Sequence, residues 1–289
     1  RSGKSADIMS LSVFFALLAA AFMHACWNAL IKVRIDRFAS ISITSLGIGL
    51  VAVPVLPFVA VPPLAVWSWI VGSVIIHIGY RLFLVRAYAA GDLAQTYPLA
   101  RGTAPLMTAI GAMVLNGEVP SHLAMIGIAL LSCGTILMSL RGGLMIGSIN
   151  RAAVGYALLT AVLISAYTLI DGNGARSAST ATSYAAWLFV CDGFTATLIG
   201  FGARGKALLS VIALEWKVGL LAGVLSATSY WIAMWAMTKA PIASVAALRE
   251  ISILFALLIS VLALGEKATR WRVAAAACIV AGAVALRLG

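Results

Sequence analysis

The sequence predicts an all-α integral membrane protein, with ten transmembrane helices arranged as a 5+5 inverted repeat around a central cavity. The mean hydropathy is +1.06, and only 10% of the residues are charged, whereas charged residues make up about a quarter of a soluble domain. Apolar stretches of about 20 residues, enough to cross about 30 Å of hydrocarbon as a helix, recur along the chain. A weak internal repeat links the two halves of the sequence.

The apolar stretches predict ten spans joined by short loops, with no soluble domain. In the first half they cover residues 12–31, 39–60, 66–88, 93–115 and 121–140. In the second half they cover residues 152–172, 180–202, 217–238, 242–264 and 270–288. The stretches are continuously apolar and do not alternate with a period of two, which excludes a transmembrane barrel.

The repeat predicts two five-helix units, residues 9–145 and 146–289, within one membrane domain. Arg101 and Gly117-Glu118 recur 148 positions later as Arg249 and Gly265-Glu266. Because five crossings is an odd number, the second unit must enter the membrane from the opposite side. Such inverted repeats are typical of secondary transporters, whose substrate site lies near the bilayer midplane between the repeats.

The net charge of +11 comes from basic residues scattered over separate short loops, which argues against a nucleic-acid partner. One side of the membrane is expected to carry Lys32, Arg34, Arg37, Arg86, Arg141, Arg151, Arg204, Lys206, Lys217, Lys267, Arg270 and Arg272. The other carries Arg176, Lys239 and Arg287, together with Arg1 and Lys4. Basic short loops face the cytoplasm, so both termini are predicted to lie outside.

Several small motifs have ordinary structural interpretations. The four cysteines lie in different apolar segments with no paired spacing, so we expect buried packing and neither a metal site nor a disulfide. The GxxxG motif at Gly219 to Gly223 favours helix packing within the bundle over dimerisation, which leaves a monomer or a weak homodimer. Pro98 and Pro105 bracket Arg101, so the fourth helix is expected to lose regular hydrogen bonds there.

Arg101 and Arg249 are the main candidates for substrate binding. Each lies about seven or eight residues inside its predicted helix, or roughly 11 to 12 Å deep at 1.5 Å per residue. A charge at such a depth costs about 2.5 to 3.5 kcal/mol, so it needs a partner or a water-filled cavity. Two interpretations remain open: the guanidinium groups bind a substrate carboxylate or similar oxyanion, or the carboxylates of Asp192 and Glu250 neutralise them. A gate closed by a salt bridge would be intermediate between these two interpretations.

Other polar residues within the predicted helices extend this site. Asp192 should point into the bundle, either coupled to protons or paired with an arginine. His24 and Asn28 lie one turn apart on the first helix, and a polar stripe on the third comprises His77, Tyr80 and Arg81. For either histidine, a structural hydrogen bond competes with a proton-relay role. Glu118 and Glu266 are expected to be boundary residues at helix ends.

Aromatic side chains inside the helices complete the candidate site. They are Trp27, Tyr97, Tyr167, Trp187, Tyr230, Trp231 and Trp235, of which we select Tyr97, Tyr167, Trp231 and Trp235 as substrate-binding, together with Tyr80. Core packing explains most of them individually. As a set, an aromatic wall beside arginines would suit an amino acid, with its carboxylate on arginine and its side chain against the rings.

Two segments carry a family resemblance. The segment from Gly91-Asp92-Leu93 to Tyr97-Pro98 leads into a helix that Gly-Glu closes, and the first helix contains His24-Ala25-Cys26-Trp27-Asn28. Both segments resemble the EamA family of the drug/metabolite transporter superfamily. The similarity to this family extends over essentially the whole chain. The resemblance implies a bacterial inner-membrane exporter of small metabolites, often amino acids, whose helices one, three, four, six, eight and nine line the cavity. The termini predicted from the loop charges depart from many members, whose termini are cytoplasmic.

The sequence therefore predicts a secondary transporter that moves an amino acid or related small organic anion by alternating access. Its partners would be the substrate and the lipid bilayer. No GxxxxGK[ST] motif is present to bind ATP, and no cofactor is expected. A membrane-embedded enzyme is the main alternative, but the chain has no HExxH or GxSxG motif. A passive channel is a third possibility.

Overall fold

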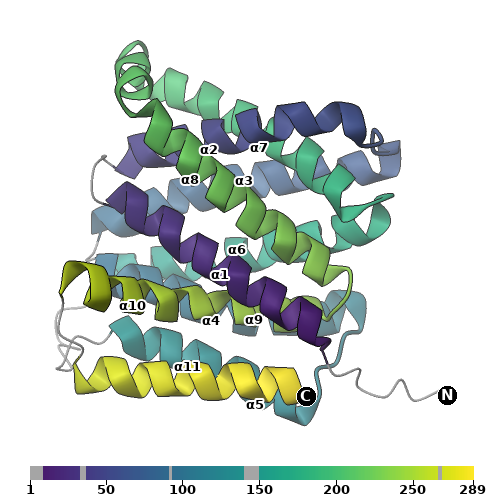
Figure 1. Cartoon of the computed structure of the whole chain (residues 1–289), viewed down its shortest axis with the longest axis vertical. Helices are drawn as coiled ribbons and strands as arrows, with labels where there is room; N and C mark the ends of the chain where they lie inside the picture. The colour runs from purple at the N-terminus through teal and green to yellow at the C-terminus, as the bar shows by residue number, and fades with distance from the viewer. Residues whose placement is uncertain (1–8, 33–36, 91–92, 140–149, 266–268) are drawn as a thin grey trace.

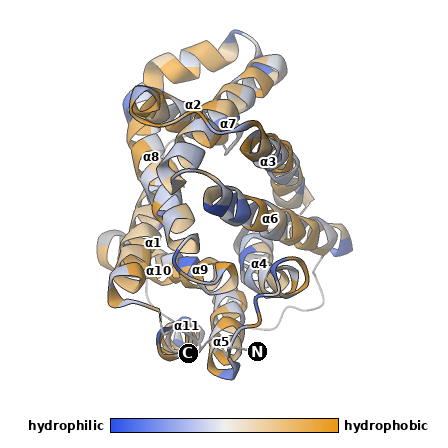
Figure 2. Ribbon diagram, turned by 90° about the vertical axis from the view of Figure 1, so that its right-hand side faces the viewer, coloured by the Kyte–Doolittle hydropathy of each residue, from blue (hydrophilic) through white to orange (hydrophobic). Residues whose placement is uncertain are grey.

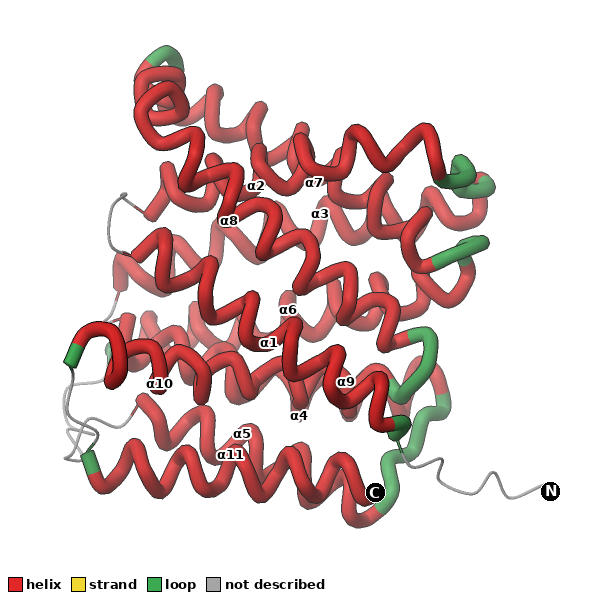
Figure 3. The backbone as a smooth tube through the Cα atoms, viewed as in Figure 1, coloured by secondary structure: helices red, strands yellow, loops and turns green. Residues whose placement is uncertain are grey.

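The protein is a bundle of membrane-length helices. The computed structural model describes residues 9–32, 37–90, 93–139, 150–265 and 269–289, and these residues form helices and loops without a strand (Figure 3). Eight of the helices are long and apolar enough to cross a bilayer, and His122–Met138 forms a shorter apolar helix. The segment with Arg101, Pro98 and Pro105 is helical but is not among the eight. The chain is therefore a multi-pass helical membrane protein.

Each predicted apolar segment coincides with a helix or with consecutive helices. In the first half these are α1 (Leu11–Lys32), α2 (Arg37–Ala52), η1 (Val53–Phe58), α3 (Leu64–Ala90), α4 (Leu93–Asn116) and α5 (His122–Ser139). In the second half they are α6 (Arg151–Ser177), α7 (Ala181–Arg204), α8 (Ala207–Met237), α9 (Ile242–Leu248), η3 (Arg249–Ile251), α10 (Ser252–Leu264) and α11 (Arg270–Leu288). Two boundaries differ from the prediction: α6 continues to Ser177, and α8 starts at Ala207 and bends at Glu215.

Side-chain caps explain where three helices of the second half begin. Asn150 accepts a hydrogen bond from the Ala152 N–H at 2.9 Å, and Thr180 accepts one from the Ser183 N–H at 3.0 Å. Thr269 caps α11 in the same way. Such caps satisfy N–H groups that have no partner within the helix. Asn150 also donates to the carbonyl of Ala90, which ties the start of α6 to the end of α3.

The two halves interleave and do not form separate lobes. The most extensive helix contacts join α5 to α11, α3 to α6, α2 to α8, α4 to α6, α1 to α8 and α2 to α7. In Figure 1 the α5 and α11 pair forms one edge of the bundle, and α2 and α7 lie near the opposite edge. End-on, α4, α6 and α9 lie between these edges (Figure 2). Because every such pair takes one helix from each half, the interface between the halves runs through the centre of the molecule.

Glycines allow the closest of these contacts. A Cβ added at Gly223 would lie 2.5 Å from the carbonyl carbon of Gly47, and one at Gly47 would lie 2.5 Å from the oxygen of Gly219. The GxxxG motif therefore packs α8 against α2 within the bundle, as expected. In the α5 and α11 pair, a Cβ at Gly134 would lie 2.9 Å from the oxygen of Ala275. Without a hydrophobic driving force between helices in lipid, such close approach is a main source of stability.

The internal repeat is visible in the backbone. Gly117 follows α4 with φ 66°, and its repeat partner Gly265 follows α10 with φ 67°. Both adopt the left-handed conformation that terminates helices and that glycine adopts without strain. The Gly-Glu signature thus marks a helix end in each half. Glu266 lies outside the described residues.

One sequence expectation was wrong: Cys133 is exposed and Cys26, Cys191 and Cys278 are only half-buried, because a thiol can face lipid as readily as protein. Pro98 and Pro105 have no N–H group to bond within the helix, yet α4 continues through both prolines as one α-helix. A helix can bend at proline and continue. The interruption lies at the repeat partner, where η3 replaces an α-helical turn at Arg249.

Substitution of Gly223 by alanine should separate α2 from α8. The new methyl group would meet only backbone atoms of Gly47 and Ile48, which cannot move aside individually. Overpacking of this kind costs about 1–3 kcal/mol, so the melting temperature of the purified protein in detergent should fall. Gly155→Ala is the matched control, because nothing lies within 4 Å of its added Cβ. Equal melting temperatures for the two variants would contradict the close packing of α2 and α8.

Candidate functional site

A buried ion pair lies between α4 and η3. Arg101 donates from Nε to Oε2 of Glu250 at 3.1 Å, and its Nη2 lies 3.0 Å from Oε1. The two side chains are only 7% and 4% exposed. Of the two interpretations left open by the sequence, internal neutralisation therefore holds for Arg101, with Glu250 as its partner.

Arg249 has a different environment. Its Cζ atom lies 4.7 Å from the centroid of the Tyr230 ring, a cation–π contact, and the residue is half-buried. Within the part of the chain that the structure describes, no carboxylate pairs with it. Arg249 also begins η3, the 3-10 turn that separates α9 from α10. The backbone stays right-handed through this turn, and a 3-10 stretch within a longer helix often marks a functional hinge.

The space between the two arginines is closed to all but the smallest occupant. A cavity of about 10 Å³, roughly the room for one water molecule, lies between α4, α6 and η3. Its lining comprises Arg101, Ala104, Pro105, Thr108, Ile164, Thr168, Ala246, Arg249 and Glu250. Nη2 of Arg101 is buried without a hydrogen bond here, because its contact with Glu250 has ion-pair distance but not hydrogen-bond geometry. A substrate would need this cavity to open.

Four rings form an aromatic cluster next to Arg249. His77 stacks on Tyr167 with a centroid distance of 4.3 Å. Tyr80 lies 5.6 Å and Tyr230 lies 6.1 Å from Tyr167, both edge to face. His77 and Tyr80 come from α3, Tyr167 from α6 and Tyr230 from α8. Of the aromatic residues predicted to form a wall, Tyr167 and Tyr230 belong to this cluster, and Tyr230 is its contact to the charge of Arg249.

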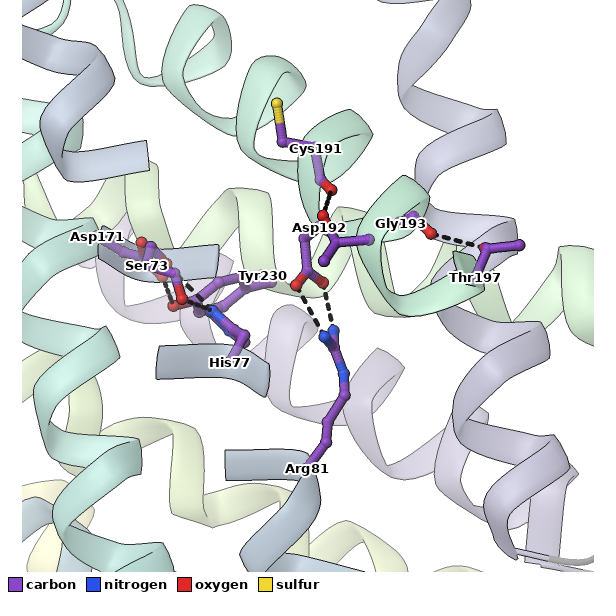
Figure 4. Close-up of polar contacts among 10 residues, drawn as sticks. Ser73, His77, Arg81, Asp171, Cys191, Asp192, Gly193, Thr197 and Tyr230 are labelled. Atoms are coloured by element: carbon purple, nitrogen blue, oxygen red, sulfur yellow. Dashed lines mark hydrogen bonds and ion pairs between the residues drawn. The ribbon is translucent and has the colours of Figure 1, made fainter. Parts of the chain in front are cut away.

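Asp192 pairs with a residue other than the two expected. Arg81 on α3 binds it through two contacts, with Nη1 to Oδ1 at 2.9 Å (Figure 4). Bidentate pairing of this type fixes both groups. Asp192 therefore neutralises Arg81 and leaves Arg249 without a partner among the described carboxylates.

Sequence reasoning missed Asp171. Its side chain is fully buried, and its carboxylate accepts hydrogen bonds from the hydroxyls of Tyr184, at 2.9 Å, and Tyr230. The predicted sixth span stopped at residue 172, which made Asp171 a residue of the helix end. The six residues that follow it include Asn173, Arg176 and Ser177, so the local sequence gave no signal that the span continues. The helix nevertheless continues to Ser177.

Glu118 is more than a boundary residue. It pairs with Arg176 at the end of α6 and accepts a hydrogen bond from the N–H of Ile242, the first residue of α9, at 2.9 Å. Arg176 in turn donates to the carbonyl oxygens of Met237 and Ala240. These contacts, which we call the clasp, join the α4–α5 loop to α6 and to the α8–α9 loop at one end of the bundle.

The polar residues of α1 mostly bond to each other. Trp27 donates from its indole N–H to Nδ1 of His24 at 3.3 Å, and the amide of Asn28 donates to the His24 carbonyl at 2.8 Å. Electrostatic interactions also link His24 to Arg101 and Arg249. Since α1 packs against η3, His24 lies at the edge of the arginine site.

The remaining aromatic candidates lie in three different places. Tyr97 interacts electrostatically with Arg101, Glu250 and Arg249 and belongs to the arginine site. Trp235 packs in the core, against both of its larger apolar clusters. Trp231 is 39% exposed and donates to Oγ1 of Thr182. Trp231 lines a separate apolar cavity of about 210 Å³ between α2, α7 and α8, so it does not line the arginine cavity.

Comparisons with known proteins agree with this architecture. Residues 151–288 match the model of the EamA-like transporter family. A solved structure titled "Crystal structure of protein" superposes with a TM-score of 0.74, covering 95% of this chain and 94% of that chain at 18% identity. At that identity the likeness shows the fold alone. No curated protein matches.

The fold and the buried charges define a multi-pass membrane protein with a polar centre. The match over its second half identifies the chain as a member of the EamA-like transporter family, within the drug/metabolite transporter superfamily. The resemblance seen in the sequence is thereby confirmed. Membership of this family implies a small-molecule substrate and a lipid bilayer as partners.

The pairing of Arg101 predicts a difference in stability between the two arginines. Arg101→Met would leave Glu250 buried without a cation, at a cost of about 3–5 kcal/mol, so the melting temperature should fall markedly. The double variant Arg101→Met/Glu250→Met should recover most of that loss. Arg249→Met is the matched control and should lose less stability than Arg101→Met, because Arg249 acts on Glu250 electrostatically but forms no ion pair with it. An equal loss in both single variants would show that Arg249 also neutralises a buried charge.

Proposed function

We propose that this protein is a secondary transporter that moves an amino acid or related small organic anion across the bacterial inner membrane by alternating access. The observation that carries the proposal is Arg249, a half-buried cation at a helix interruption with an aromatic ring as its contact. Its planar donor fork suits a carboxylate. The rings of His77, Tyr80 and Tyr167 beside it suit the rest of a small organic molecule.

The helix contacts support a 5+5 inverted repeat formed by residues 9–145 and 146–289. Under exchange of the halves, the contact between α3 and α6 corresponds to that between α8 and α1. The contact between α4 and α6 corresponds to those of α1 with α9, η3 and α10. The contacts of α5 with α11, α2 with α7 and α4 with α9 map onto themselves. A two-fold relation of this kind lets the halves rearrange around a fixed central site.

The clasp supports a gate at one end of that site. Glu118 and Arg176 close the end at which α4 finishes and α9 starts, which is the predicted outer end. The cavity between the arginines holds little more than a water molecule. In an alternating-access cycle the clasp would open when the substrate exchanges with the outside. We propose export as the direction, in accordance with the family.

Arg249→Ala should abolish substrate exchange without loss of folding. We would reconstitute the protein in liposomes and measure counterflow of L-phenylalanine, L-leucine, L-aspartate, uracil and methylphosphonate. Loss of a charged hydrogen-bond partner costs about 1.5–3 kcal/mol, so uptake of a bound carboxylate should fall by about ten- to a hundredfold. Arg86→Ala is the matched control: Arg86 is also an arginine over an aromatic ring, with Cζ 5.6 Å from the centroid of Phe83, but it is exposed.

The same measurement separates the alternatives. Counterflow at the wild-type rate in Arg249→Ala would remove Arg249 from the site. Flux that never saturates and shows no counterflow would indicate a channel, and a chemically altered probe would indicate an enzyme.

The predicted topology places Lys239 outside and Lys206 in the cytoplasm. Both side chains are exposed, at opposite ends of α8. In intact cells, a membrane-impermeant maleimide should therefore label Lys239→Cys in a background without the native cysteines, and should label Lys206→Cys only after permeabilisation. The reverse pattern would invert the orientation of the whole chain.

A further inference from the structure

Three carboxylates are buried among the described residues of the bundle, and one of them differs from the others. Asp192 is neutralised by Arg81 and Glu250 by Arg101. Asp171 is 0% exposed and has no cation as its partner in the described part of the chain; its carboxylate accepts hydrogen bonds from the hydroxyl groups of Tyr184, Tyr230 and Ser73. An ionised carboxylate without a cation is costly at this depth in a membrane. Of the three buried acids, Asp171 has the least compensated negative charge. Protonation would therefore stabilise Asp171 more than Asp192 or Glu250.

The groups around Asp171 come from α6 itself and from three helices packed against it, α3, α7 and α8. Ser73 and His77 face it from α3, Tyr184 from α7, Tyr230 from α8 and Tyr167 from α6 itself. From α4 and η3, the charges of Arg101, Arg249 and Glu250 face Tyr167 and do not contact the carboxylate. The only base in this set is His77, whose Nδ1 lies 3.1 Å from Oγ and 3.0 Å from the carbonyl oxygen of Ser73.

Tyr230 connects Asp171 to the proposed anion site. Its hydroxyl donates a hydrogen bond to Oδ2 of Asp171 (Figure 4). The centroid of its ring lies 4.7 Å from Cζ of Arg249. A movement of Tyr230 would thus change both contacts together.

We propose that Asp171 is the site at which this transporter binds and releases a coupled proton, and that Tyr230 couples this proton to a carboxylate bound at Arg249. The inference rests on the proposed function and adds its coupling ion. A proton from water on the open side forms an O–H bond with the Asp171 carboxylate, and that bond breaks when the site faces the other side. Proton and anion travel together, because a neutral Asp171 does not repel an incoming carboxylate.

Thermodynamic reciprocity makes the coupling measurable. If protonation of Asp171 strengthens anion binding, then anion binding strengthens protonation by the same factor. The direction of transport then follows the sum of the two gradients, and a sufficiently large substrate gradient drives export.

Residues along α3 provide a route for the proton. Ser73, His77 and Arg81 are spaced by four and therefore lie one turn apart on one face. His77 interacts electrostatically with both Asp171 and Asp192. In chain order the row runs towards the end of α3 at Ala90, and Figure 4 shows Ser73, His77 and Arg81 in this order.

The first experiment requires no substrate. Infrared difference spectra of the purified wild type in nanodiscs, titrated across neutral pH, should show the carbonyl band of a protonated carboxylic acid. Asp171→Asn should lack this band while melting within a few degrees of the wild type, since the amide preserves the shape of the side chain. A band that persists unchanged in Asp171→Asn would overturn the proposal.

The second experiment measures coupling with L-phenylalanine as the probe. In liposomes with the membrane potential clamped, an inside-alkaline pH gradient should make the wild type accumulate the probe. Asp171→Asn should keep counterflow and lose accumulation by about tenfold or more, the size of a typical coupling free energy. Tyr230→Phe, which keeps the ring and removes the hydroxyl, should also lose accumulation and serves as the second variant if Asp171→Asn does not fold.

The outcomes distinguish this inference from the proposed function. If the wild type exchanges L-phenylalanine but does not respond to the pH gradient, or if both variants accumulate it normally, proton coupling at Asp171 is wrong and the transporter remains. If no probe exchanges at all, the proposed function fails. The infrared titration still decides whether Asp171 binds a proton.

Discussion

The bundle depends on neutralising charge inside an apolar environment. All three ion pairs among the described residues, Arg81–Asp192, Arg101–Glu250 and Glu118–Arg176, join a residue of the first half to one of the second. In lipid, helices gain little from burying apolar surface against each other, so close glycine packing and polar contacts must hold the halves together. The same pairs are the contacts that a rearrangement of the halves would have to break or carry along.

One position breaks the symmetry of the repeat at its centre. Arg101 and Arg249 are repeat partners, but the residue after Arg249 is Glu250, whereas the residue after Arg101 is Gly102. A Cβ at Gly102 would lie 2.6 Å from a side-chain carbon of Ile136, so the first half has no room for a second carboxylate there. Among the described residues, Arg101 and Arg249 thus have only one adjacent carboxylate between them, that of Glu250. Glu250 pairs with Arg101, and Arg249 keeps its charge beside Tyr230, which is the basis of the proposed anion site.

Hydropathy was sufficient to predict the helical segments, and the resemblance of two segments to a known family predicted the family. The prediction of helix ends failed where a helix extends beyond its apolar stretch. α6 and α8 extend beyond the predicted apolar spans, and Asp171, which lies next to the predicted end of the sixth span, was not selected as a site residue. Glu118 was also read as a boundary residue, because nothing in the local sequence indicates that Arg176 and the N–H of Ile242 lie beside it.

The sequence by itself determined that the chain crosses a membrane many times and that arginines lie within its apolar segments, because these properties follow from composition and spacing. Only the tertiary structure decided how the charges pair. Residues separated by 111 positions, as in Arg81 and Asp192, or by 149, as in Arg101 and Glu250, meet solely through helix packing. Partner choice depends on which helix faces touch, and an almost uniformly apolar sequence carries little information about that.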